Sequence, residues 1–164
     1  MPANFARLCE LGDTLADNIG RFLKNYSPKS RCERVWSIAL NTETFQTWSD
    51  EDRTFSTFVV PLGYRSEVMD RGADEAFYDY GLMFCEHYSD QGSPSTSWLD
   101  DRMKMAIDVV DEFGEVRDPM EGEKDGPRAE SAEFIDLLNE TMLQELKLYY
   151  GDAKLTFKEV VNND

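Results

Sequence analysis

Alternation of polar and apolar positions dominates the middle of the chain, from residue 54 to residue 88. Between residues 75 and 88 the even positions include Ala76, Tyr78, Tyr80, Leu82, Phe84 and Tyr88. The odd positions are Glu75, Phe77, Asp79, Gly81, Met83, Cys85 and His87. Successive side chains of a strand point to opposite faces of a sheet, so this period predicts a strand. Residues 54–62 predict its neighbour, and residues 63–74 a polar link between the two. Pro61 has no N–H and is expected at the end of its strand or at a sheet edge.

Spacings of three and four residues predict two amphipathic helices. The first covers residues 3–25, with an apolar stripe of Phe5, Leu8, Leu11, Leu15, Ile19 and Phe22. The second covers residues 97–114, with Ser97 as its expected N-cap and Gly114 as its stop. Its stripe is Leu99, Met103, Ala106, Val110 and Phe113.

The other segments give weaker patterns. Residues 34–40 predict a first strand, and the polar residues 41–53 a short helix or an extended excursion. Composition predicts a loop over 89–97 and a mobile acidic loop over 115–128. Periodicity over 132–139 favours a helix continuing through residue 150. Gly151 and Asp152 predict a turn before a final strand over 153–161.

These elements predict one α+β domain over residues 1–164, a mostly antiparallel sheet of four to five strands with helices packed on one face. A chain of 164 residues can bury roughly 70% of the surface that its unfolded form exposes. It therefore needs neither disulfides nor a metal to build a core.

Charge narrows the choice of function. The chain has 33 acidic and 17 basic residues and a net charge of −16, which disfavours binding to nucleic acid through phosphates. Three interpretations stay open: plain solubility, a decoy that mimics DNA, or a surface past which DNA slides without binding tightly. No apolar run approaches the ~20 residues that span a bilayer, and the first residues lack a signal-peptide layout. We therefore expect synthesis in a cytoplasm and no membrane partner.

The chain contains little that predicts catalysis. Cys85 and His87 share a strand face, but a metal or Cys–His site would need further ligands, so an ordinary sheet residue is favoured. The three scattered cysteines indicate reduced thiols. No phosphate-binding glycine loop, nucleophile elbow or zinc-type cysteine spacing is present. We predict no catalytic residues, no metal and no cofactor, and expect a protein that is not an enzyme. The aromatic series Tyr78, Tyr80, Phe84 and Tyr88 is either a base-stacking platform or core, and the lack of basic neighbours favours core.

One segment suggests a family. It comprises Val59-Val60-Pro61, a link with Arg65, Glu67 and Arg71, the run Tyr78-Asp79-Tyr80-Gly81-Leu82, and a helix starting near Leu99-Asp100-Asp101 with Val109, Val110 and Phe113. In order and spacing, residues 34–113 resemble the tail-completion proteins, or tail terminators, of tailed bacteriophages. The final strand at 155–161 matches loosely.

The resemblance implies an α+β subunit of a homo-oligomer, a hexameric ring at the head-proximal end of the tail. Its partners would be the tail tube protein and neck or connector proteins, its location the virion, and DNA would pass without tight binding. It also implies a strand over 132–139, which we adopt. Alternatives are another neck protein (a stopper or adaptor) and an acidic DNA mimic that inhibits a host nuclease. The mimic is disfavoured because the acids cluster in loops and are mixed with basic residues.

A channel for DNA should be negatively charged, because lysines would hold phosphates and slow transit. We therefore predict that Glu121, Glu123 and Asp125, in the acidic loop, face the lumen of the ring. The long acidic loop is itself a departure from the family pattern.

Overall fold

The computed structural model describes residues 4–27, 30–37, 54–88, 94–116, 119–120, 122–123 and 125–162. Its elements, in chain order, are α1 (Phe5–Leu23), β1 (Arg31–Arg34), β2 (Ser56–Asp70), β3 (Ala73–His87), α3 (Thr96–Gly114), β4 (Arg128–Asp136), α4 (Glu140–Leu146) and β5 (Leu148–Asn162). The predicted α+β class is confirmed.

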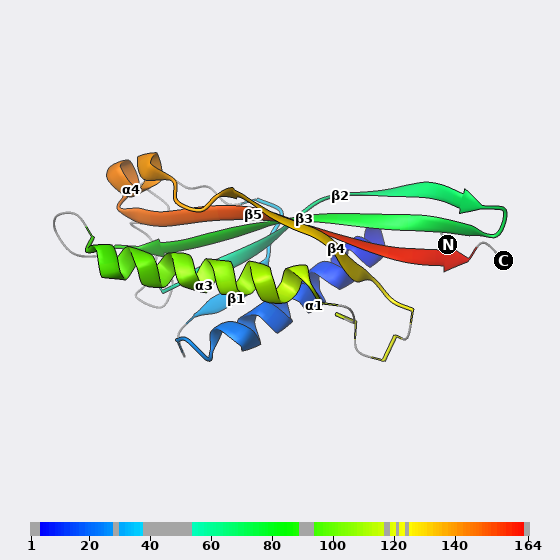
Figure 1. Cartoon of the computed structure of the whole chain (residues 1–164), viewed down its shortest axis with the longest axis horizontal. Coiled ribbons are helices and arrows are strands. Elements are labelled where there is room, and N and C mark those ends of the chain that lie inside the picture. Colours follow the sequence, from blue (N-terminus) through cyan, green and yellow to red (C-terminus); the bar gives the residue numbers. More distant parts are fainter. Residues whose placement is uncertain are drawn as a thin grey trace.

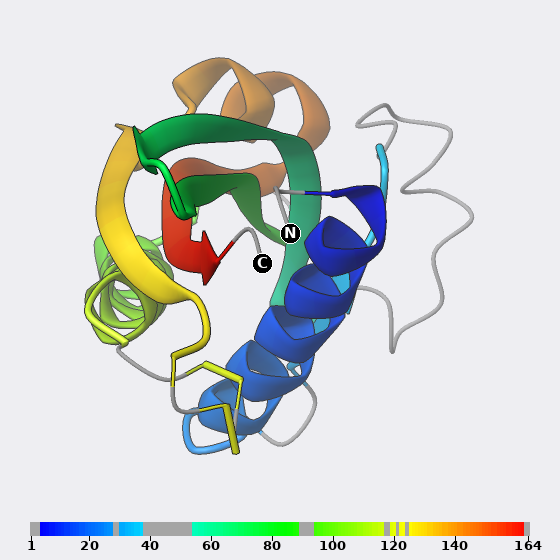
Figure 2. The same ribbon diagram turned by 90° about the vertical axis from the view of Figure 1, so that its right-hand side faces the viewer.

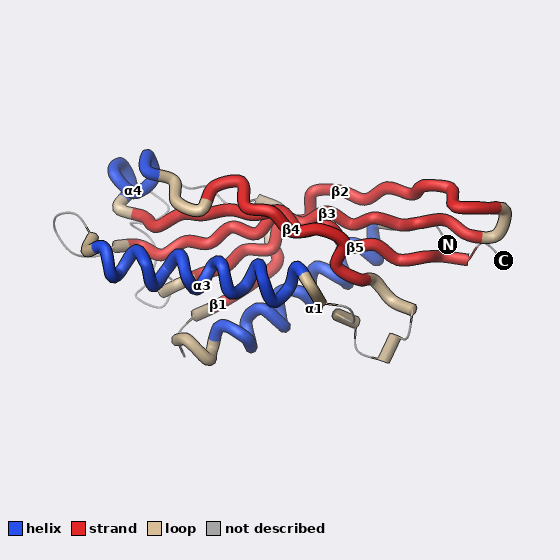
Figure 3. The backbone as a smooth tube through the Cα atoms, in the orientation of Figure 1, coloured by secondary structure: helices blue, strands red, loops and turns tan. Residues whose placement is uncertain are grey.

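The strands form one five-stranded sheet in the order β1-β2-β3-β5-β4 (Figure 3). Only the short β1–β2 pair is parallel, while β2–β3, β3–β5 and β4–β5 are antiparallel. Three strands of 15 residues each, β2, β3 and β5, form the long axis of the molecule (Figure 1).

The main core lies between this sheet and two helices. α1 packs on β1 and β2, and α3 packs on β4 and β5, both on the same side of the curved sheet (Figure 2). The even positions of β3 face the helices as predicted, since Ala76, Tyr78, Tyr80, Leu82 and Phe84 are at most 1% exposed. The Tyr80 hydroxyl donates to the Leu8 carbonyl at 2.6 Å, so this buried phenol ties the sheet to α1. Of the predicted aromatic series, Tyr78, Tyr80 and Phe84 are core, whereas Tyr88 is half-buried and packs on Trp98.

The predicted polar link over 63–74 is wrong, because strands β2 and β3 run through it to a tight turn. The turn is at Arg71 and Gly72, where the Gly72 N–H donates to Asp70 Oδ1 at 2.9 Å. At this end of the hairpin, residues 64–70 of β2 are all exposed, so the strand carries charged residues and its sequence resembles a link. Pro61 lies at an edge as expected, since β1 pairs with β2 only as far as Val59.

The first strand occurs earlier than predicted, at Arg31–Arg34 instead of 34–40. Trp36 is not a core residue: it is 53% exposed and stacks on Phe5 with 5.6 Å between the ring centroids. Residues 38–53, including the predicted helix or excursion over 41–53, lie outside the described residues.

The turn predicted at Gly151-Asp152 is also wrong, because β5 passes straight through it. A Cβ at Gly151 would lie 2.7 Å from the Leu137 carbonyl oxygen and 2.9 Å from the Tyr149 hydroxyl. This glycine therefore permits close packing between β5 and the neighbouring backbone. Glycine is also common in turns, so the sequence around Gly151 does not distinguish a turn from a closely packed strand.

Residues 132–150, where the sequence supports either a strand or a helix, are divided between two elements. β4 ends at Asp136, so most of the adopted strand over 132–139 is confirmed, and α4 occupies part of the helix that periodicity favoured. Nearly all of β4 is exposed at the sheet edge, which leaves no buried stripe to mark its period.

The helices themselves match the predictions closely. α1 is two residues shorter at each end than the predicted 3–25. α3 begins one residue earlier than predicted because Ser95, not Ser97, is the N-cap and accepts a hydrogen bond from the Trp98 N–H at 3.2 Å. α3 ends at Gly114 as expected, where a Cβ would lie only 2.6 Å from Ala132 Cβ on β4.

Candidate functional site

The hairpin end of the sheet extends beyond both core helices (Figure 1). We call this part the strand arm and define it as residues 62–70 of β2, 73–79 of β3 and 156–162 of β5. α4 lies at the opposite end of the sheet (Figure 3). The strand arm is therefore a projecting surface, held together by backbone pairing on both sides of β3.

The outer strand of the strand arm is β2, which forms an edge of the described sheet. Among the described residues, no strand pairs with β2 beyond Val59 on the side away from β3. Two register irregularities, at Leu62 and Met69, bracket a regular stretch from Gly63 to Val68. The edge of a sheet is where a further strand of another chain can add.

Large apolar side chains are unusually exposed along this edge. The exposed fractions are 56% for Leu62, 46% for Tyr64, 83% for Val68 and 54% for Met69. Exposed apolar residues grouped on one edge indicate an association surface more strongly than scattered ones. The strand arm therefore combines the two features that favour strand-to-strand association.

Charged residues lie on the opposite face of the same strand. Arg65 donates to Asp79 Oδ2 at 3.0 Å, lies 3.6 Å from Glu67 Oε1, and places its guanidinium 4.3 Å from the centroid of the Phe77 ring. Arg65 and Glu67 are both about half exposed, at 49% and 59%. Each is thus available to a second strand on this edge.

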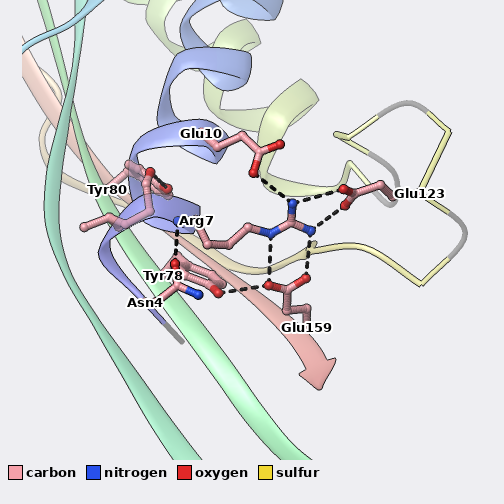
Figure 4. A network of polar contacts seen from close by, with 8 residues as sticks. Asn4, Arg7, Glu10, Tyr78, Tyr80, Glu123 and Glu159 are labelled. Atoms are coloured by element: carbon pink, nitrogen blue, oxygen red, sulfur yellow. Dashed lines mark hydrogen bonds and ion pairs between the residues drawn. The ribbon is translucent and has the colours of Figure 1, made fainter. Parts of the chain in front are cut away.

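A polar network fixes the strand arm to α1 (Figure 4). Arg7 Nε and Nη2 donate to the two carboxylate oxygens of Glu159 at 3.1 and 3.0 Å, and the Tyr78 hydroxyl donates to Glu159 Oε1 at 2.9 Å. The Arg7 and Glu159 side chains are only 17% and 9% exposed. This planar two-bond pairing is the strongest geometry available to arginine and a carboxylate.

The same guanidinium binds the acidic loop. Arg7 Nη1 donates to Glu123 Oε1 at 3.0 Å, Nη2 contacts the second Glu123 oxygen, and Nη1 also donates to Glu10 at 3.2 Å. The hydrogen bonds to Glu123 and Glu159 hold the pKa of Arg7 above its ordinary value, and Arg7 in turn lowers the pKa of Glu123. One cation thus joins α1, β5 and the loop, with three carboxylates around it.

The predicted lumen residues have different surroundings. Glu123 pairs with Arg7, the Asp125 side chain is exposed, and Glu121 lies outside the described residues. The described part of the acidic loop is anchored, because Met120 is 7% exposed in the core and Asn18 donates to the Pro119 carbonyl at 3.4 Å. The structure therefore does not bring the three acids together as one free charged group.

Arg7 and the strand arm were both missed by the sequence reasoning. Arg7 precedes Leu8 in an ordinary amphipathic helix, and Glu159 comes 152 positions later, so no local spacing connects them. Exposed alternation of apolar and charged residues from Tyr64 to Val68 was a usable signal for the strand arm, although it was interpreted as a link.

The described residues contain little that fits catalysis. Burial raises the pKa of the Cys85 thiol to about 12, which disfavours the thiolate that a nucleophilic cysteine needs. Cys85 packs with Phe58 and Leu148 in a second cluster, apart from the main core under α1 and α3, and Leu146 of α4 packs against it. Among the described residues, no group of three or more His, Cys, Asp or Glu side chains is arranged to hold a metal ion.

Within the described part of the chain, no helix is both long and apolar enough to cross a lipid bilayer. Comparison with protein-family models gave no match, and neither did a search of curated proteins.

Proposed function

We propose that the chain is a structural protein of a tailed bacteriophage, a tail terminator that forms a ring at the head-proximal end of the tail. The proposal rests on the resemblance of residues 34–113 to tail-completion proteins. The structural observation that supports it best is the strand arm, whose outer edge carries Leu62, Tyr64, Val68 and Met69 exposed. Such a surface suits a protein that works through contacts with other proteins.

A ring requires two different surfaces that meet head to tail with a rotation that closes. The sheet has two unlike edges: the apolar edge of β2 and the edge of β4, which carries acidic residues such as Glu130, Glu133 and Asp136. Unlike edges on one rigid sheet give each subunit the two ends that a ring needs. We expect this ring to form on the tail tube, which acts as its template.

The acidic character fits a channel through which DNA passes. In the proposed ring, Asp125 is the best candidate for a lumen-facing charge, because its side chain is exposed. Glu123 contributes less, because Arg7 lies against its carboxylate. Glu121 stays in the prediction as a third lumen residue.

Disrupting the gene tests the proposal. A stop codon early in the gene of the encoding phage should give lysates in which electron microscopy shows heads and tails unjoined. Tails should also vary in length, because the end of the tube lacks its cap. Supplying the intact gene in trans should restore joined particles. Normal joined particles without the protein would refute the proposal.

A second experiment tests the lumen residues. Replacing Glu121, Glu123 and Asp125 together with lysine should slow DNA ejection from assembled particles, because the new cations hold phosphates. A matched control replaces Asp100, Asp101 and Glu145, on α3 and α4, with lysine and should leave the ejection rate unchanged. Equal rates in the two variants would contradict the lumen assignment.

A further inference from the structure

Two acidic side chains face each other where β4 ends. Asp136, the last residue of β4, lies directly opposite Asp152 in the antiparallel register with β5. Side chains directly opposite on antiparallel strands point to the same face, with their Cβ atoms about 4.5–5.5 Å apart. Like charges in this position destabilise a sheet, and two carboxyl groups that share a site can share one proton. The register therefore places a pair of interacting carboxyl groups at the end of β4.

Asp152 has few hydrogen-bond donors around it. Among the described residues, its Oδ1 atom is buried without a hydrogen-bond partner, and its Oδ2 atom accepts a long hydrogen bond from the Tyr150 hydroxyl at 3.4 Å. Burial raises the pKa of Asp152 above its ordinary 3.8; a hydrogen bond from the Asp136 N–H opposes this rise in part, and the charge of Asp136 adds to it. A proton on Asp152 would turn the unpartnered oxygen into a donor and remove one of the two opposed charges.

The neighbouring charged groups leave this imbalance in place. Lys154 follows Asp152 on the same face of β5, but it lies directly opposite Glu133 of β4. On its other side, β5 places Asp152 opposite the uncharged Met83 of β3. The charged residues of α4 are exposed, and both are acidic: Glu140 and Glu145. The one nearby lysine on this face thus already has a carboxylate opposite it.

The chain beyond Asp136 folds back against β5. The Leu137 carbonyl accepts a hydrogen bond from the Tyr149 hydroxyl at 2.9 Å. The Asn139 N–H donates to the Tyr150 carbonyl at 2.9 Å. α4 starts directly after this segment, so any change in how residues 136–139 are held also changes how α4 is held.

We propose that Asp136 and Asp152 form a proton-operated clasp, which holds residues 136–139 against β5 in acid and loosens them near neutral pH. In acid, the Asp152 carboxyl keeps its proton and donates it in a hydrogen bond to the Asp136 carboxylate. Near neutral pH both groups are ionised and repel each other. A carboxyl whose pKa is raised by folding stabilises the closed form most below its ordinary pKa, and this contribution is lost as the pH rises through the raised pKa. The clasp does not depend on the proposed function.

Hydrogen exchange of the Asn139 amide tests the clasp. In Asp152→Asn the side chain is uncharged at every pH, and its amide can donate to Asp136. At pH 7 the Asn139 amide should exchange about two- to fivefold more slowly in this variant than in the wild-type protein, which corresponds to relieving one like-charged cross-strand pair. At pH 3 the two proteins should exchange at equal rates, because wild-type Asp152 then carries its proton. Asp111→Asn, which removes an exposed carboxylate on α3, should match the wild-type rate at both pH values.

The carboxyl ¹³C shift of Asp152 gives a second measurement on the folded protein. Its titration midpoint should lie above 3.8, and Asp136→Asn should lower it, because an amide donor then replaces the like charge. The clasp is refuted if Asp152 titrates at or below 3.8, or if Asp152→Asn fails to slow exchange of the Asn139 amide at pH 7. Slowing of the same size at pH 3 would also refute it, since the effect would then not depend on the proton. These measurements use the isolated protein, so their outcome is independent of the gene-disruption test.

Discussion

Replacing Arg7 with methionine should destabilise the protein by about 2–4 kcal/mol. Breaking a buried ion pair by removing one partner typically costs ~3–5 kcal/mol, because the other charge is left buried without compensation. Glu159 is 9% exposed and, among the described side chains, would retain the Tyr78 hydroxyl as its one donor, so it lies close to that case. The bonds to Glu123 and Glu10 add little, since these partners are 40% and 56% exposed. Partial exposure of Arg7, 17%, lowers the expected value somewhat.

Urea unfolding followed by far-UV circular dichroism measures this loss as a change in the free energy of unfolding. Methionine keeps the apolar stem of the arginine, so the change reports on the charge more than on packing. Arg21→Met is the matched control on the same helix. Arg21 is exposed, and Asn18 is the partner to which it donates, so its replacement should cost less than about 0.5 kcal/mol.

A second substitution separates charge from structure. In the Arg7→Met background, Glu159→Gln should recover much of the lost stability, because the buried group then carries no charge. The reasoning is refuted if Arg7→Met costs less than about 1 kcal/mol, or if the added Glu159→Gln change brings no recovery.

Three further predictions concern the fold and its pH dependence. Gly151→Ala should destabilise the protein by about 2 kcal/mol, since its Cβ has no space. The control Gly81→Ala, whose Cβ has its nearest atom at 3.7 Å, should change the stability by no more than about 0.5 kcal/mol. Thermal unfolding measures both changes, and equal losses in the two variants would contradict the close packing at Gly151. Ser95→Ala should cost about 1 kcal/mol in urea and Ser97→Ala less than half of that, and equal costs would contradict the N-cap assignment. Because Arg7 lowers the pKa of Glu123 below its ordinary 4.5, the stability advantage of wild type over Glu123→Gln should hold at pH 6–7 and shrink as pH falls below 4.5; an advantage that grew with acid would contradict the pairing.

Much of the fold was predictable where one side of an element is buried and the other is not. The helices 5–23 and 96–114 have this property, and in β3 the even positions 76–84 are buried more completely than the odd ones, so periodicity predicted all three correctly. Each has a buried layer on one side, so the hydrophobic effect leaves a regular imprint on the sequence.

The candidate site was less predictable, for physical reasons. In the strand arm, residues 64–70 of β2 are all exposed, so their alternation of apolar and charged residues was interpreted as a polar link. β4 is exposed along nearly its whole length and shows a helical spacing as readily as a strand one. The Arg7–Glu159 pair joins positions 152 residues apart, a contact that only the folded sheet creates.

The most direct test of the proposed role is to locate the protein in purified phage particles. A short epitope tag on the chain, detected by immunogold electron microscopy, should place the label at the junction between head and tail in joined particles. Mass spectrometry of the same particles should detect the chain as a virion component. Absence of the chain from purified virions, or label along the whole tail or on the head shell, would contradict the account.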